Sequence, residues 1–137
     1  AGGQAPSRGA AARGLAAALL LAAALAALDL RSLGYERARN GALAAMAAGA
    51  PERAEAELRP ALGEKLFRAP ALEFLGRLNL AAPGGEPRAA VYYEETLLEN
   101  RYSAEAWRSL RKIYSVPGRE RDAAGLELRR REVYQGD

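Results

Sequence analysis

The chain has 137 residues, with 20 Lys and Arg against 17 Asp and Glu, and it contains neither His nor Cys. This composition excludes a zinc site built from His or Cys, a Ser–His–Asp triad and a His general base, so we expect no enzyme, no cofactor and no metal site. Ala and Leu dominate while Val, Ile and Thr are scarce, which predicts an all-α fold.

The net charge of +3 is not spread evenly along the chain. Residues 1–31 hold Arg8, Arg13 and Arg31 against Asp29, and the remainder is close to neutral. Binding to nucleic acid usually requires a clustered basic face, so we expect no nucleic-acid partner.

The N-terminal part is a cationic tail followed by the apolar run "GLAAALLLAAALAAL" at residues 14–28. As a helix this run is about 22 Å long, and extending it over residues 10–30 brings it close to the roughly 30 Å of a bilayer core. Its six leucines contribute roughly −2 to −3.5 kcal/mol to insertion. The composition therefore predicts a marginal transmembrane helix within an N-terminal domain of residues 1–31.

Three interpretations of this run remain open: a retained membrane anchor, which we favour, a helix packed in the core of a protein polymer, and a signal peptide. Small residues spaced by four would allow close packing with another helix: Gly14, Ala18, Ala22 and Ala26. Arginines flank the run on both sides, so the positive-inside rule does not decide its orientation. By analogy with other single-pass bacterial repeat proteins, we expect a domain of residues 32–137 outside the cytoplasm.

Beyond the apolar run, Gly, Pro and Asn clusters divide the chain at regular intervals. They are "GAPE" at 49–52, "RAP" at 68–70, "APGGEP" at 82–87, "ENRYS" at 99–103 and "VPGRE" at 116–120. The intervening segments show apolar spacing near 3.6 residues, and no segment alternates like a strand. We therefore expect helices at about 10–48, 51–66, 70–81, 86–99, 103–115 and 119–134.

Pairs of short helices prompt a search for repeats, and several columns recur every 35 residues. Two of them occur three times, as Ala54, Ala89 and Ala124 and as Leu58, Tyr93 and Leu128. Others occur twice, as Leu72 with Trp107, Leu75 with Leu110, and Gly41 with Gly76, and Tyr114 completes the pattern "WRSLRKIY". We expect the alanines to allow close helix approach and the bulky residues to fill the space between neighbouring helix pairs.

At these residues the chain resembles the tetratricopeptide repeat (TPR) family, whose pattern is W-x2-L-G-x2-Y followed by A-x3-F. The resemblance covers about residues 33–134 and departs from the family in its period, which is 35 instead of 34. It implies an α-solenoid of about three stacked helical hairpins. It also implies a non-enzymatic scaffold that binds other proteins in a groove lined by the first helix of each pair.

Carried over to this chain, the groove residues would be Glu73, Arg77, Glu105, Arg108 and Lys112. We expect Tyr92, Tyr102 and Tyr134 to lie either in the core or at an interface, and "RRRE" at 129–132 to form the polar face of the last helix. The favoured function is a membrane-anchored scaffold subunit of an envelope assembly that binds other proteins or copies of itself. The alternative is a self-polymerising subunit of an extracellular filament, with the apolar helix at its axis.

Overall fold

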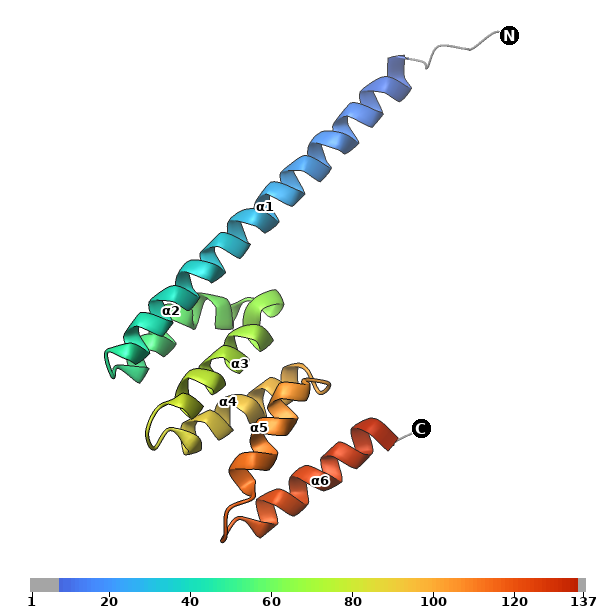
Figure 1. Ribbon diagram of the computed structural model, residues 1–137. Helices are drawn as coiled ribbons and strands as arrows, with labels where there is room; N and C mark the ends of the chain where they lie inside the picture. Colours follow the sequence, from blue (N-terminus) through green and yellow to red (C-terminus); the bar gives the residue numbers. More distant parts are fainter. Residues whose placement is uncertain (1–7, 136–137) are drawn as a thin grey trace. The chain divides into compact units, whose positions relative to one another are not determined.

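The computed structural model describes the backbone of residues 8–135 and the side chains of residues 16–135. Within that part the chain is all-helical, which confirms the predicted fold class. The helices are α1 (Arg8–Ala47), α2 (Pro51–Gly63), α3 (Lys65–Ala81), α4 (Glu86–Glu99), α5 (Ala104–Tyr114) and α6 (Glu120–Gln135) (Figure 1). The chain divides into two units after Glu36, five residues later than the predicted domain boundary, so the last part of α1 belongs to the second unit.

The helix ends follow from local chemistry at three glycine turns. Gly49, Gly84 and Gly118 have φ values of 71°, 69° and 90°, a left-handed conformation that costs glycine little. Each glycine ends a turn between a helix and the next one, at α1–α2, α3–α4 and α5–α6. Helix α5 begins at an N-cap, Ser103, whose hydroxyl accepts a hydrogen bond from the Ala106 N–H at 3.1 Å.

One predicted boundary is wrong. The sequence placed a break at "RAP", residues 68–70, but the chain leaves the helical conformation at Glu64, directly after Gly63. Pro70 lies inside α3, as Pro60 lies inside α2. A proline near the start of a helix removes only one backbone hydrogen bond, whereas the extended conformation of Glu64 (φ −99°, ψ 122°) ends α2 outright.

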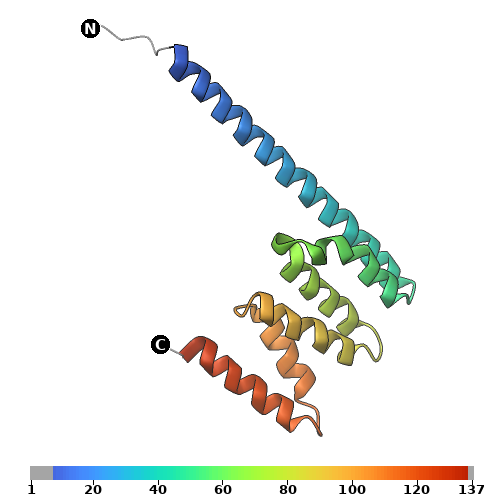
Figure 2. The same cartoon turned by 180° about the vertical axis from the view of Figure 1, so that it is seen from behind.

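In the second unit each helix packs mainly on its neighbour in the sequence, from α2 on α3 to α5 on α6. Figures 1 and 2 show from opposite sides that α3, α4, α5 and α6 follow one another in space as they do along the chain. Polar contacts also connect helices that are two apart. Arg88 on α4 binds Glu52 on α2 at 3.0 Å, and Arg77 on α3 binds Glu105 on α5 at 3.3 Å.

Most residues of the predicted repeat columns are buried. Partners 35 residues apart share this burial, as in the pairs Ala54 and Ala89, Leu58 and Tyr93, Leu72 and Trp107, and Leu75 and Leu110. Tyr114 and Gly76 are buried as well. Gly76 leaves room for the Tyr93 ring, because a Cβ at this position would lie 2.9 Å from two ring carbons. Tyr92, which the repeat pattern left unassigned, is also buried.

The last helix departs from the prediction, because Ala124 and Leu128 are exposed and Leu128 keeps 60% of its surface accessible. Gly84 follows Gly49 by 35 residues, but Gly118 follows Gly84 by only 34. The shorter turn shifts α6 by one residue, so Ala123 packs against the core in place of Ala124, and Leu126, which lies 34 residues after the buried Tyr92, is buried in it. An α-helix turns about 100° per residue, which places Leu126 and Leu128 on nearly opposite faces.

Candidate protein-binding surfaces

Three of the five predicted groove residues come together where α3 faces α5. The Glu73 carboxylate accepts a hydrogen bond from the Ser103 hydroxyl at 2.6 Å. Four residues further along α3, Arg77 forms an ion pair with Glu105. Glu73, Arg77 and Glu105 are thus partnered within the chain, and their contacts hold α5 against α3.

The other two groove residues, Arg108 and Lys112, are exposed on α5, and the described part of the chain provides no ion pair for either. They line different hollows. Arg108 lies at a pocket of about 330 Å³ between α5 and α6, and Lys112 lies at a hollow of about 480 Å³ near the ends of α3 and α5. The predicted five-residue groove is therefore not one continuous site.

The α5–α6 pocket combines an aromatic floor with a basic rim. Trp107 and Leu126 form the buried floor, with 7% and 4% of their surfaces exposed. The half-exposed Tyr134 ring stands edge-on to Trp107, with centroids 6.5 Å apart. The indole N–H of Trp107 donates a hydrogen bond to the Arg101 carbonyl oxygen at 2.8 Å, which fixes the ring in the floor.

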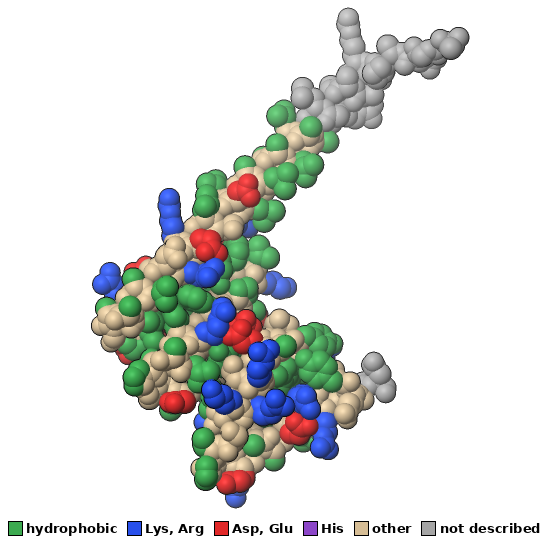
Figure 3. Space-filling view, in the orientation of Figure 1, with side chains coloured by type: hydrophobic (Ala, Val, Ile, Leu, Met, Phe, Trp, Pro, Cys, Tyr) green, Lys and Arg blue, Asp and Glu red, His purple; other side chains and the backbone are tan. Residues whose placement is uncertain are grey.

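The rim of the α5–α6 pocket carries Arg108, Arg111 and Arg130, with Glu127 as its acidic residue. Figure 3 shows basic side chains gathered over α5 and α6. Glu127 is already shared between two arginines of its own helix, at 3.2 Å from Arg130 and 3.6 Å from Arg131. The guanidinium groups of Arg108 and Arg111 therefore remain available to a negatively charged partner.

Two further hollows repeat one arrangement at the turns. The larger, of about 700 Å³, lies among the ends of α1, α2, α3 and α4, and the smaller is the hollow near Lys112. Five residues that line the larger hollow have counterparts 35 positions later in the smaller one. The first set is Pro51, Glu52, Leu78, Ala81 and Gly84, and the second is Glu86, Pro87, Ile113, Val116 and Arg119.

A half-buried carboxylate, Glu94 on α4, connects three helices. Arg129 of α6 binds it through both terminal nitrogens, at 2.7 and 2.9 Å, and Tyr114 of α5 donates a hydrogen bond at 2.8 Å. Burial opposes ionisation of Glu94, but the hydrogen bonds from Arg129 and Tyr114 outweigh it and lower its pKa. Burial and the Glu94 hydrogen bond together raise the pKa of Tyr114 to about 12.

Sequence reasoning missed this cluster. It assigned the run at 129–132 to a polar outer face, whereas Arg129 turns toward the adjoining helices and anchors α6. Glu94 and Arg129 are 35 residues apart, close to the 36 residues between the ion-paired Glu52 and Arg88, and this recurring spacing of opposite charges was the available signal.

The apolar part of α1 forms a surface of its own. Between Ala16 and Leu33 every described side chain is exposed, including Leu19, Leu20, Leu21 and Leu25. A helix over Ala16–Ala47 is long and apolar enough to cross a membrane, and none of its most apolar window is buried. Ala18, Ala22 and Ala26 of the predicted packing stripe are exposed on this helix, while Gly14 lies outside the residues whose burial is described.

Within residues 16–135, no group of three or more acidic side chains is placed to hold a metal ion. Compared with protein-family models, curated proteins and solved structures, the chain matches none of them.

Proposed function

We propose that this chain is a membrane-anchored, TPR-like scaffold: a stack of helical hairpins that binds other proteins without chemistry of its own, held at a membrane by α1. One observation carries the proposal. A folded helical unit is continuous, through α1, with an apolar stretch whose leucines are exposed at every position from 19 to 33. The arrangement attaches a binding unit to a bilayer.

The cost of leaving this stretch in water supports the anchor. Seven leucines between residues 19 and 33 expose 47–72% of their surface. Full burial of a leucine contributes about 1.5–3 kcal/mol, so covering the remaining surface would contribute roughly 6–13 kcal/mol. This is comparable to the whole stability of a typical domain, about 5–15 kcal/mol. A lipid or protein environment therefore has to cover the helix.

The hairpin stack is supported by periodic features that do not depend on one another. Residues 35 apart share burial, the turn hollows share five lining positions, and Gly41 and Gly76 each face a side chain of the helix that follows. Contacts between α2 and α4, between α4 and α6, and between α3 and α5 join equivalent faces of successive pairs. Stacked helix pairs offer extended open surfaces, which suit a binding protein.

The anchor can be tested by the substitution Leu25→Lys in the middle of the apolar run. A lysine at the centre of a membrane helix costs about 2.5–3.5 kcal/mol, which cancels the whole insertion free energy of a marginal span. We expect the unsubstituted chain to remain in the membrane pellet after an alkaline carbonate wash and the variant to be washed out. Ala44→Lys is the matched control, since Ala44 is exposed on the same helix but lies in the second unit, C-terminal to the apolar run at residues 14–28.

Detergent extraction separates the scaffold from its rivals. A released chain that carries other proteins in fixed stoichiometry supports the scaffold. Detergent-resistant fibres of this chain alone would instead establish the filament subunit, and secretion of a product that lacks the apolar run would establish a signal peptide. Retention of the Leu25→Lys variant in the washed membrane would refute the anchor.

A further inference from the structure

The α5–α6 pocket corresponds to a surface of the preceding helix pair, α3 and α4, and there helix α5 covers that surface. Helix α5 packs on α4, and its Trp107 and Leu110 share a buried cluster with Tyr93 of α4. The α6 residue 34 positions after Tyr93 is Glu127, at the rim of the pocket. Trp107 on the floor is in turn the equivalent of Leu72, which is 2% exposed. The pocket therefore presents the same face that α3 and α4 present to α5.

The polar contacts that seat α5 define what this face recognises. At the N-terminal end of α5, Ser103 donates to Glu73, and Glu105 pairs with Arg77. The residues 35 positions after Glu73 and Arg77 are Arg108 and Lys112. The first position has changed from acidic to basic, and the second has remained basic.

We propose that the α5–α6 face binds a helix of another protein whose first turn is acidic, packed as α5 packs on α3 and α4. The proposal rests on the scaffold function and names the chemistry of its partner. Where α5 has Ser103 against Glu73, the partner carries an Asp or Glu against Arg108, and where α5 has Glu105, the partner keeps an acidic residue that Arg111 on the same rim can bind. Apolar residues one and two turns later cover Trp107.

Charge and surface composition favour this occupant. The rim holds two arginines without an ion pair in the described residues, so an acidic turn gains two unshared guanidinium partners. The floor offers an indole and the ring of Tyr134, residue types that dominate protein interfaces. The outer face of α6 opposite the pocket carries Arg121 and Glu132 beside the exposed Leu128, so it is less apolar than the pocket floor.

The test uses the full chain in detergent micelles and two labelled peptides of about four helical turns. The acidic peptide begins with Asp at the position of Ser103 and Glu at that of Glu105, and it has leucines at the positions of Trp107 and Leu110. The basic peptide has lysine at the positions of Ser103 and Glu105. Binding is measured by peptide anisotropy and by the fluorescence of Trp107, the one tryptophan in the sequence.

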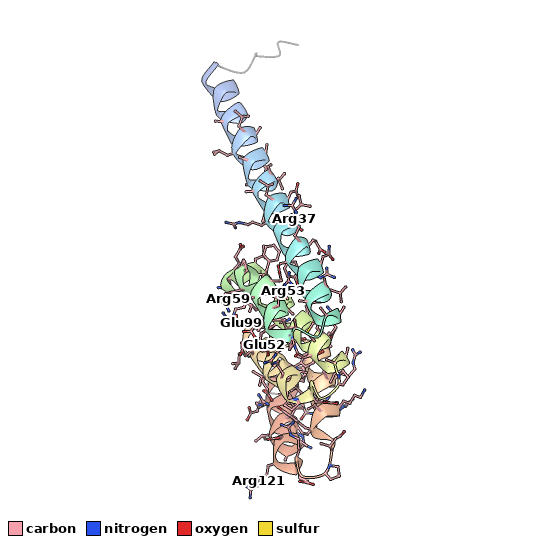
Figure 4. All side chains as sticks on the ribbon, turned by 90° about the vertical axis from the view of Figure 1, so that its left-hand side faces the viewer. Arg37, Glu52, Arg53, Arg59, Glu99 and Arg121 are labelled. Carbon is pink, nitrogen blue, oxygen red and sulfur yellow. The ribbon has the colours of Figure 1, made fainter. Side chains whose placement is uncertain are left out.

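We expect the acidic peptide to bind and the basic peptide to bind at least about tenfold more weakly. Arg108→Glu should weaken the acidic peptide by about tenfold or more and should bind the basic peptide better than the unsubstituted chain does. This gain of binding cannot arise from misfolding. Arg121→Glu is the matched control: Arg121, labelled in Figure 4, is exposed on α6 and does not line the pocket, so both affinities should be unchanged.

Equal binding of both peptides would overturn the inference, and so would an equal loss of binding in Arg108→Glu and Arg121→Glu. Arg108-dependent binding to anionic lipid vesicles or inorganic phosphate, but not to the acidic peptide, would also overturn it. So would Arg108-dependent dimerisation of the chain. If the extracted chain still carries other proteins while the peptides fail, the scaffold function stands and this site falls. If peptide binding persists while the Leu25→Lys variant stays in the washed membrane, the peptide site stands and the membrane anchor falls.

Discussion

Replacing Gly76 with alanine tests the packing on which the stack depends. Gly76 is buried within α3, and a Cβ there would lie 2.9 Å from the Cε1 and Cζ atoms of Tyr93. The Tyr93 side chain is fully buried, so its ring has no free space into which to withdraw. The substitution therefore forces α3 and α4 apart or pushes the ring into its neighbours.

The magnitude follows from two opposing effects. Alanine is favoured over glycine in a helix interior by about 1 kcal/mol. Overpacking a filled core costs typically about 1–3 kcal/mol. We therefore expect Gly76→Ala to lower the free energy of unfolding by up to about 2 kcal/mol despite the better helix propensity.

Two other glycines serve as controls with the same chemical change. A Cβ at Gly125, inside α6, would meet nothing within 4 Å, so Gly125→Ala should stabilise the chain by up to about 1 kcal/mol. A Cβ at Gly41 would meet the end of the Glu57 side chain at 2.8 Å, which can move, so Gly41→Ala should be nearly neutral. Urea unfolding of the full chain in detergent, followed by Trp107 fluorescence, measures all three. A Gly76→Ala variant as stable as Gly125→Ala would refute the close approach.

Two more predictions concern a charge and a turn. Glu94→Gln should destabilise the chain at neutral pH. Because the folded pKa of Glu94 is lowered, its contribution is fully present above its ordinary value of 4.5 and is lost as the pH falls through the folded pKa. Urea midpoints of both chains should therefore converge in acid, and a pH-independent gap would contradict the ion pair with Arg129. Gly85→Ala should cost at least about 2 kcal/mol in the same assay, since the new Cβ would lie 1.9 Å from the Asn79 carbonyl oxygen, and stability equal to that of the unsubstituted chain would disprove this turn geometry.

The helical fold was predictable because the residues that end one helix and begin the next act locally. Glycine at 49, 84 and 118 and proline at 51 and 87 act through backbone geometry that needs no tertiary information. The buried columns through Leu58, Tyr93 and Trp107 were predictable because a 35-residue spacing returns each position to the same face of an equivalent helix. Neither feature depends on which helices touch.

The errors have a different origin, since each depends on contacts or on a change in spacing. Ala124 and Leu128 were assigned by continuing a period that shortens at Gly118. The groove residues Glu73 and Arg77 were expected to face a partner because a charged residue in a sequence carries no sign of its neighbour 28 or 30 residues away. Partner choice among many arginines and glutamates is decided by packing.

The end of the stack also differs chemically from its interior, and this difference bears on what binds there. In α4, Tyr93 packs with α5 residues and Thr96 is buried as well, and both are at most 1% exposed. Their counterparts in α6, 34 residues later, are Glu127 and Arg130, which remain accessible at the rim of the α5–α6 pocket. An apolar helix packed there would bury Arg108 and Arg111 without partners, at a cost of several kcal/mol for each ion. A helix that supplies carboxylates avoids this penalty, because Arg108 and Arg111 then gain partners while Glu127 keeps its ion pairs with Arg130 and Arg131. If this face binds a helix as we propose, its charges therefore favour an acidic helix over an apolar one.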